Sequence, residues 1–375
     1  MRLLFLISLF LPIATSNLLA NFSQPEFFDI VIDRDHPDRV YKAFEDFIAK
    51  FNRKYKDEKE KSFRFNNFVK AYNTVNELND KSQKAGKDTK FGINKFSDWT
   101  SAEFSRTLSH VPPANMTALG DAKPFSFPKS NTSRVKRQSS RYPDSFDLRD
   151  EKVNGRHIVG PVKDQGECAC CWGFAVTAVM ETANAVSSGK FSSLSDQEIC
   201  DCATDGTPGC VGGSLDMGIR YVKKYGQSGD WDYPYDQWRA HKGRRCLLKS
   251  TRRVIPARVM EFVAINRRKA ESEIMYILTN WRVPVAVYFK VGHSFKQYKD
   301  GVLSDEDCYG SEWHGGAIVG YDTNRHGENY WIVKNSWGDN SWGLNGYVYI
   351  KRGIDWCAIE ESPVTGDMSS HKNDY

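Results

Sequence analysis

Between residues 41 and 79 apolar residues recur at helical spacing in a polar sequence. Lys and Glu separate apolar residues that return every three or four positions, the interval that aligns side chains on one face of an α-helix. We therefore predict two amphipathic helices. The next stretch, FGINKFSDWT (91–100), has alternating apolar positions and favours a strand. The apolar positions of the two helices are Phe44, Phe47, Ile48 and Phe51, then Phe65, Phe68, Val69, Tyr72 and Val75.

The second half of the chain changes from helical to strand-like patterns. Apolar spacing predicts helices at 172–188 and 215–225, whereas VPVAVYFKV (283–291) and YWIVKN (330–335) predict strands. Residues 109–140 are rich in Pro, Ser, Thr and Asn and predict an exposed linker before this half. This order predicts an α+β protein in which a helical subdomain precedes a barrel-like, strand-rich subdomain, with a cleft between them.

The first residues resemble a secretory signal. Residues 1–16 combine a charged start, a short apolar run and small residues at a cleavage point, and the run is too short to span a bilayer as a helix. We expect this signal to be removed and the protein to enter the secretory pathway, with no membrane anchor. The dibasic run Arg134-Val-Lys-Arg137 lies in the predicted linker, where a processing protease could cut, although such a run can also be an ordinary solvated cluster. Glycosylation sequons begin at Asn21, Asn115 and Asn131.

Composition narrows the class of protein. The chain has 375 residues, 40% hydrophobic, with a net charge of +5 spread along its length. These values are typical of a soluble globular protein and give no support for nucleic-acid binding. All nine cysteines lie at or after Cys168, so the first part folds without disulfides. An odd number in a secreted protein leaves at least one thiol unpaired or bonded elsewhere.

Candidate chemistry centres on one of these cysteines. In QGECACCWGF (165–174), Cys171 stands at the first turn of the predicted helix, where backbone N–H groups and the helix dipole favour a thiolate. Such a nucleophile needs a base, a group that orients the base, and donors for an oxyanion. His314 in EWHGGAIVG and Asn335 in VKNSWG each stand beside a strand-like run and could supply the first two.

The order Cys171, His314, Asn335 resembles that of the papain-like cysteine peptidases. The segments QGECACCWGF, LSDQEICDC (194–202), GCVGG (209–213) and KNSWGDNSWGLNGYVYIKRG (334–353) are similar to segments of that family. Upstream, two sets of residues resemble a helical motif and a short motif of the family's inhibitory pro-region. Ala71 stands at a position of the helical motif where Asn is usual. The two sets are Glu60, Arg64, Phe68, Val75 and Asn79, and then Gly92, Asn94, Phe96 and Asp98.

The resemblance implies a division of the chain and a set of roles. Residues 17–137 would be the pro-region, with an inhibitory helical domain at about 40–105, and residues 138–375 the catalytic domain. Cys171 would be the nucleophile, His314 the base and acid, Asn335 the orienter, and Gln165 an oxyanion donor. Trp337 would shield the His–Asn hydrogen bond from water. The substrate-binding residues implied are Gly212, Gly213, Ser214, Leu215, Trp313, Trp337 and Ser362.

The same resemblance implies three disulfides, Cys168–Cys210, Cys202–Cys246 and Cys308–Cys357. Cys170 and Cys200 stay unassigned, either as a fourth bridge or as buried thiols. Zinc bound by Cys168, Cys170 and Cys171 is an alternative, although their spacing lacks the usual gaps of structural zinc sites. We expect no metal or cofactor.

Several positions depart from the family pattern: Trp313 precedes the His, and Ala169, Gly173 and Ala358 stand where Gly, Ala and Gly are usual. We expect Trp313 to affect efficiency or pH dependence. The stretch between Cys210 and Cys246 is too short for the occluding loop of the family's carboxydipeptidases and has no His-His pair, so the resemblance favours an endopeptidase. The pocket implied at Ser214, Leu215 and Ser362 looks uncharged and roomy and favours bulky apolar side chains.

The expected protein is therefore a monomeric cysteine endopeptidase, lysosomal or extracellular, whose partners are peptide or protein substrates and its own pro-region. Two other classes stay open. A catalytically impaired relative could act as a binding or inhibitory module, although Gln165, Cys171, His314 and Asn335 are all present. A disulfide-stapled extracellular structural domain would instead require Cys171 to be paired.

Overall fold

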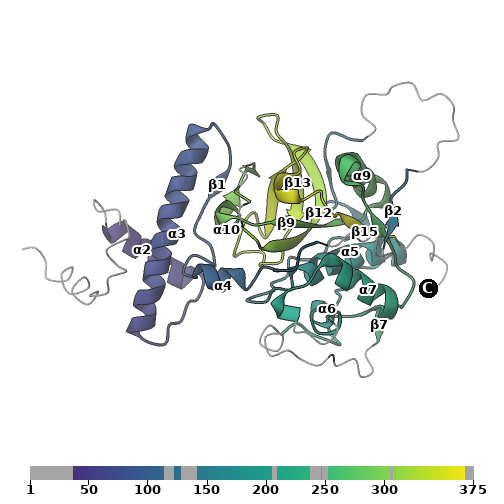
Figure 1. The fold of residues 1–375 in the computed structure, drawn as a ribbon, viewed down its shortest axis with the longest axis horizontal. Helices are drawn as coiled ribbons and strands as arrows, with labels where there is room; N and C mark the ends of the chain where they lie inside the picture. Colours follow the sequence, from purple (N-terminus) through teal and green to yellow (C-terminus); the bar gives the residue numbers. More distant parts are fainter. Residues whose placement is uncertain are drawn as a thin grey trace, which may run out of the picture.

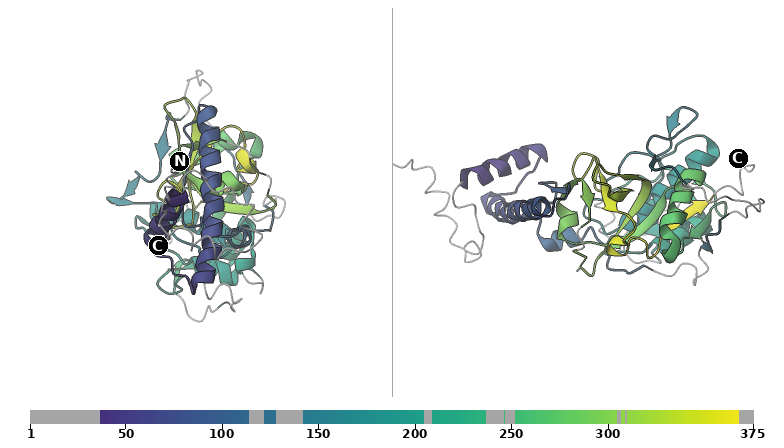
Figure 2. Two further views of the ribbon diagram at one scale, coloured as in Figure 1. Left: turned by 90° about the vertical axis from the view of Figure 1, so that its left-hand side faces the viewer. Right: turned by 90° about the horizontal axis from the view of Figure 1, so that it is seen from above.

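The computed structural model describes residues 37–113, 122–127, 142–204, 209–236, 246, 252–304, 307–308 and 310–367. The predicted signal, the sequons and the dibasic run lie outside these residues. We call 37–127 the N-terminal segment and 142–367 the main body. The long helix of the N-terminal segment stands beside one end of the main body in Figure 1 and in the right-hand view of Figure 2.

Helical periodicity in the N-terminal segment is confirmed. Helix α2 spans Pro37–Lys50 and α3 spans Glu58–Lys84, which begins at the N-cap Asp57, whose side chain accepts a hydrogen bond from the Glu60 N–H. Phe44, Phe47 and Phe68 pack between the two helices in a small separate core. This core is built from aromatic contacts and has no disulfide.

The strand expected over 91–100 is mostly wrong. Only Lys90–Phe91 forms a strand, β1, which pairs antiparallel with β10 (Tyr298–Asp300). Beyond it the Asn94 side chain accepts a hydrogen bond from the Phe96 N–H at 2.9 Å, which folds the chain into a turn. Short polar side chains compete for backbone groups in this way and interrupt strands. A short helix α4, Ser101–Ser105, then begins with a Thr100–Glu103 capping box.

The helical half of the main body contains the predicted helices. Helix α5 spans Cys171–Ser188 and α7 spans Leu215–Tyr225, in agreement with the sequence patterns, and α6 (Asp196–Cys202) lies between them. Helix α5 is buried along most of its length because it packs against α7 on one side and strands β9 (Val285–Lys290) and β12 (Trp313–Thr323) on the other. It ends at Gly189, whose φ of +74° lies in the left-handed region that favours glycine.

The strand-rich half is confirmed, but the described strands form an open sheet and not a closed barrel. Its order is β11–β14–β13–β12–β9–β15–β8–β2, with β3 paired to β12. The bounds not yet given are β13 Asn329–Lys334, β14 Tyr347–Lys351, β15 Val364–Asp367, β8 Glu261–Ala264, β11 Val302–Leu303, β2 Lys123–Pro124 and β3 Phe146–Asp147. The smaller elements are β4 Lys152–Val153, β5 Arg156–His157, β6 Gln227–Ser228, β7 Arg253–Ile255, α9 Ala270–Tyr276, α10 His293–Gln297 and the short helical turns η2 Gly209–Val211, η3 Arg267–Lys269, η4 Ile277–Trp281 and η5 Trp356–Ala358.

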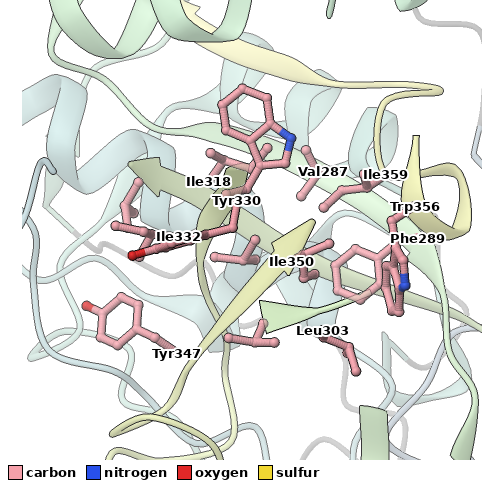
Figure 3. Packing of buried hydrophobic residues seen from close by; sticks show 14 of the residues in the cluster. Val287, Phe289, Leu303, Ile318, Tyr330, Ile332, Tyr347, Ile350, Trp356 and Ile359 are labelled. Carbon is pink, nitrogen blue, oxygen red and sulfur yellow. The ribbon is translucent and has the colours of Figure 1, made fainter. Parts of the chain in front are cut away.

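Two buried clusters cover the two faces of this sheet. Successive side chains of a strand point to opposite faces, and β9 shows this directly. Val287 and Phe289 join the cluster of the strand-rich half, part of which Figure 3 shows, whereas Ala286 and Tyr288 join the cluster shared with α5 and α7. Tyr288 therefore points toward the helical half of the molecule.

The cysteines form four disulfides. The three predicted bridges, Cys168–Cys210, Cys202–Cys246 and Cys308–Cys357, are all confirmed. The open question about the remaining pair is answered by a fourth bridge, Cys170–Cys200. Cys171 stays free and buried. Disulfides hold Cys168 and Cys170, so the zinc alternative is excluded, and the free Cys171 contradicts the purely structural alternative.

Within the described residues, no helix combines the length and apolar character needed to cross a membrane.

Candidate active site

Cys171 is the first residue of α5 and points into the contact between the two halves of the main body. Strand β12 passes close to it, and a Cβ added at Gly315 would lie only 2.8 Å from the Cys171 carbonyl oxygen. A glycine is therefore required for this approach. The close approach brings His314, the neighbour of Gly315, to the N-terminal end of α5.

The predicted base and its orienter form a hydrogen bond. His314 Nε2 lies 2.7 Å from Asn335 Oδ1, and this oxygen also accepts the Ser336 N–H at 2.8 Å. Because an amide oxygen only accepts, Nε2 carries the hydrogen and the neutral ring keeps its lone pair on Nδ1. Within the described residues Nδ1 has no hydrogen-bond partner. Burial lowers the pKa of His314 to about 4, against a smaller rise from the Asn335 hydrogen bond.

Trp337 covers this pair, as the resemblance implies. Its ring centroid lies 4.6 Å from the His314 ring, and neither residue is exposed. The rings of Phe289 and Phe295 contact His314 at 5.7 and 5.8 Å. Such an apolar enclosure excludes water and strengthens the hydrogen bond that fixes the imidazole.

Gln165 is held from two sides. Its Oε1 accepts a hydrogen bond from Ser336 Oγ at 2.6 Å, and its Nε2 donates to Cys168 O at 2.6 Å. The same Nε2 donates to Thr107 O of the N-terminal segment at 2.8 Å. The Gln165 amide, the predicted oxyanion donor, is thus held in a fixed orientation and already donates to a carbonyl oxygen of the N-terminal segment.

The N-terminal segment passes through the site. Ser109 forms both backbone hydrogen bonds of an antiparallel bridge with Trp313, at 2.8 and 2.7 Å. Its hydroxyl donates to Gly213 O at 2.7 Å and accepts the Gly213 N–H at 3.0 Å. An extended chain therefore runs between Gly213 on the helical wall and Trp313 on the strand wall. Sequence reasoning missed residues 107–109, which it assigned in part to a linker.

Under this cover the Cys171 thiol is buried and its protonated form is favoured. Cys171 is 0% exposed, and burial raises its pKa to about 12 although backbone N–H groups, among them those of Gly315 and Trp172, pull it the other way. His314 is neutral under the same cover. The thiolate–imidazolium pair needed for attack is therefore disfavoured while the N-terminal segment is in place.

Other contacts fasten the segment beside the site. Phe96 and Phe104 pack edge-on against Trp337, with centroids 4.9 and 5.5 Å apart from it. Asn94 Nδ2 donates to Lys296 O at 2.8 Å, and Lys95 Nζ pairs with Asp164 at 2.7 Å. The Gly92 N–H donates to Gln297 O at 2.9 Å, so three of the four short-motif residues singled out in the sequence, Gly92, Asn94 and Phe96, contact the main body directly.

Of the predicted substrate-binding residues, Gly212, Gly213 and Trp313 lie against Ser109 of the N-terminal segment. A Cβ at Gly212 would come within 2.8 Å of the Ser109 hydroxyl. The Ser214 side chain bonds Asp216, Leu215 is buried, and the half-buried Ser362 lies two residues before Val364 of the same cluster as Leu215. Trp313 stacks on Tyr288 with centroids 5.8 Å apart.

Tyr288 lies beside the residues for which a roomy pocket was expected, and that pocket stays a prediction. Its ring is fully buried in the cluster that holds Leu215 and Trp313, and its hydroxyl donates to Gly213 O at 2.7 Å. It therefore bridges the two walls beside the passage that Ser109 follows. The sequence shows an aromatic residue in a strand-like run, and the alternation of β9 could have indicated its face, but not its partner.

Comparisons with known proteins agree with this site. Residues 142–366 match the model of the papain family cysteine proteases, and residues 44–104 match the cathepsin propeptide inhibitor domain. Fruit bromelain of Ananas comosus is 34% identical over 351 residues, which cover 91% of this chain and 90% of that protein. Cysteine endopeptidase RepA of Oryza sativa subsp. japonica is 33% identical over 304 residues, which cover 80% and 74%.

Solved zymogens have the same fold. The digestive procathepsin L2 proteinase from Tenebrio molitor larval midgut superimposes with a TM-score of 0.73 at 30% identity, covering 88% of this chain and 99% of that one. The recombinant stem bromelain precursor gives 0.72 at 28% identity, covering 88% and 100%. The fold and site thus define a cysteine protease with an inhibitory pro-region. This chain belongs to the papain family, as a cysteine endopeptidase with cathepsin L-like relatives.

Proposed function

We propose that the chain is a secreted or lysosomal cysteine endopeptidase, made as an inactive zymogen, in which Cys171 is the nucleophile. The observation that carries the proposal is the hydrogen bond from His314 Nε2 to Asn335 Oδ1, which leaves Nδ1 with its lone pair beside the start of α5. The free thiol stands at that helix start. A thiol, a base and an orienter are the groups that acyl transfer requires.

The first half of the reaction makes an acyl-enzyme. His314 Nδ1 takes the Cys171 proton, and the sulfur attacks the scissile carbonyl carbon. Gln165 Nε2 and the Cys171 N–H donate to the oxygen that becomes negative. His314 then gives its proton to the departing amine, and the peptide bond breaks to leave a thioester on Cys171.

The second half restores the enzyme. A water molecule loses its proton to His314 as it attacks the thioester carbonyl, and the same oxyanion donors stabilise the second tetrahedral intermediate. The acid product leaves when the carbon–sulfur bond breaks, and the sulfur regains its proton or remains a thiolate paired with the imidazolium. Asn335 keeps the ring oriented in both halves through its hydrogen bond to Nε2.

The pro-region would keep the zymogen silent by occupying both oxyanion and substrate positions. Thr107 O accepts a hydrogen bond from Gln165 Nε2, and the backbone N–H and C=O of Ser109 bond the C=O and N–H of Trp313. We propose that residues 17–137 are removed, after which Cys171 and His314 regain contact with water and their pKa values can approach each other. The predicted signal at 1–16 and the dibasic run ending at Arg137 support a secretory route for this maturation.

Substrate choice follows from the passage between Gly213 and Trp313. The residue that occupies it in the zymogen is the small Ser109, and the Tyr288 ring fills the adjoining space. We therefore propose that substrates carry a small side chain, such as Gly, Ala or Ser, at this position, in place of the bulky apolar side chain expected from the sequence. No His-His pair obstructs the cleft in the described residues 211–236, which supports cleavage within chains.

The proposal is tested by turnover. The full zymogen is expressed in a secretory host, allowed to mature, and assayed on denatured protein and on short fluorogenic peptides. We expect activity in the native protein, a loss of at least about a thousandfold in Cys171→Ala, and a smaller loss in Asn335→Ala, which leaves both reacting groups in place. A correctly folded, pro-region-free protein without peptidase activity would favour the alternative, a catalytically impaired binding module.

A further inference from the structure

The pro-region touches the main body at a second place, away from the cleft. Its strand β2, Lys123–Pro124, pairs parallel with β8 at the edge of the large sheet. The Phe125 N–H extends this pairing with a hydrogen bond to Ala264 O at 2.9 Å. Figure 1 shows β2 beside α9 and β15, at the end of the molecule opposite α3.

Side chains reinforce this pairing. The Phe125 ring lies 5.6 Å from the Trp281 ring and 5.8 Å from the Tyr276 ring, and Phe127 packs edge-on against Tyr276 at 5.4 Å. Such ring pairs contribute beyond the area that they bury. Lys123 adds an ion pair to Glu261 at 3.2 Å. Two aromatic residues separated by one residue thus face an aromatic pair on the main body.

Removal of the pro-region would break both the strand pairing and the ring packing of this contact. On its other side β8 is paired with β15, so loss of β2 makes β8 an edge strand with unpaired backbone groups. Tyr276 and Trp281 lose the rings that partly cover them. An open edge strand next to exposed aromatic rings is a template for a further extended chain.

We propose that, in the mature enzyme, the β8 edge together with Tyr276 and Trp281 is a second peptide-binding site, an exosite for protein substrates. Its ligand is an extended segment with the pattern basic–x–aromatic–x–aromatic, as in Lys123–Phe127 of the pro-region. This inference rests on the proposed removal of the pro-region. The site binds a distant part of a substrate and holds it near the cleft, which raises the effective concentration of the scissile bond.

The experiment measures binding without turnover. A fluorescein-labelled peptide with the sequence of residues 121–128, DAKPFSFP, is titrated by anisotropy with matured protein whose cleft is blocked by an irreversible thiol inhibitor. We expect saturable binding. Replacing both Phe residues of the peptide by Ala should raise Kd at least tenfold, which is on the order of the free energy of one aromatic ring contact. The intact zymogen should not bind, because its own segment occupies the site.

Variants of the protein locate the site. Glu261→Lys reverses a partly exposed charge and should weaken binding several-fold without affecting folding, whereas Trp281→Ala tests the aromatic contact. Tyr225→Ala, an exposed aromatic on α7, is the matched control and should change nothing. Cleavage of a short fluorogenic peptide should be the same in Glu261→Lys and native enzyme, while KM should rise only for substrates that carry the KPFSF segment.

Three results would overturn the inference: no saturable binding, equal affinity of the peptide without Phe residues, or unchanged binding in both Glu261→Lys and Trp281→Ala. Competition between the labelled peptide and a cleft inhibitor on unblocked enzyme would also overturn it, because binding would then lie in the cleft. Anisotropy does not require catalysis. A peptide that binds an inactive mature protein would therefore leave the exosite standing while the proposed function fails.

Discussion

Replacing Tyr288 by Val should change the proposed preference for small side chains into a preference for large apolar ones. The Tyr288 ring is fully buried, stacks on Trp313 with an interplanar angle of 8°, and reaches Gly213 O across the passage. Valine suits a strand position such as this one in β9 because its branched side chain packs well on a pleated surface. The substitution removes the ring and leaves the space beside the passage open.

The magnitude follows from burial. Enclosing a Leu- or Phe-sized side chain in the new space should contribute about 1.5–3 kcal/mol. This corresponds to a rise of about 10- to 150-fold in kcat/KM for a bulky over a small residue at this position. The same change should lower the free energy of unfolding by about 2–4 kcal/mol, since a large buried side chain is truncated. The zymogen should therefore melt at a lower temperature.

The assay is a peptide library with this one position varied, cleaved by matured native, Tyr288→Val and Tyr288→Phe enzymes. The Phe variant is the matched control: it loses only the hydrogen bond to Gly213 O, a cost of about 1 kcal/mol in stability, and should keep the native preference. A native enzyme that already prefers Leu or Phe would refute the reasoning. So would a Val variant whose profile is unchanged.

Three further predictions follow from single contacts. Burial lowers the pKa of His314 to about 4, so between pH 6.5 and 4 the unfolded chain binds more protons than the folded one. In a Cys171→Ser zymogen, the free energy of unfolding should therefore fall by about 2–3 kcal/mol as the pH drops through this window. The His314→Gln variant should lose this part of the pH dependence of the melting temperature. Gly173→Ala would set a Cβ 2.8 Å from Cys170 Sγ; it should cost about 1–3 kcal/mol in denaturant unfolding, and at most half as much in a Cys170→Ala background. Ala358 has a φ of +67°, so Ala358→Gly should raise the unfolding free energy by about 1 kcal/mol, and no gain would show that the backbone is not strained there.

Local patterns in the sequence predicted what depends on local physics. Helices α3, α5 and α7 and strands β9 and β13 follow from apolar periodicity, because each buries one face or one stretch against a neighbour. The strand expected at 91–100 failed for a local reason too. Asn94 folds its own segment through side-chain hydrogen bonds, which periodicity does not register.

Part of the candidate site was predictable from the sequence, and part of it was not. Cys171, His314 and Asn335 were identified through spacing and resemblance, and the hydrogen bond between the last two has the expected partners. The Cys170–Cys200 bridge could not be assigned from sequence, since it depends on how α6 packs against the start of α5. Gly173 was noted as a departure from the family, and only the structure shows that it leaves room for the Cys170 sulfur.

Contacts that join distant segments were the least predictable. Tyr288 is one apolar residue in a buried strand, and nothing in the run VPVAVYFKV indicates that its hydroxyl reaches Gly213. Likewise, Phe125 and Phe127 stand in a Pro- and Ser-rich stretch that predicts an exposed linker. Their partners Tyr276 and Trp281 lie far along the chain, and only the three-dimensional arrangement brings the four rings together.

We propose above that Cys171 is a nucleophile and that the pro-region keeps it inactive. The most direct measurement treats the zymogen and the matured protein with an epoxysuccinyl thiol-protease inhibitor and locates the adduct by peptide mass spectrometry. We predict a stoichiometric adduct on Cys171 in the matured protein, with loss of peptidase activity, and almost none in the zymogen, where the thiol is fully buried. A folded, pro-region-free protein whose Cys171 stays unmodified would contradict the account.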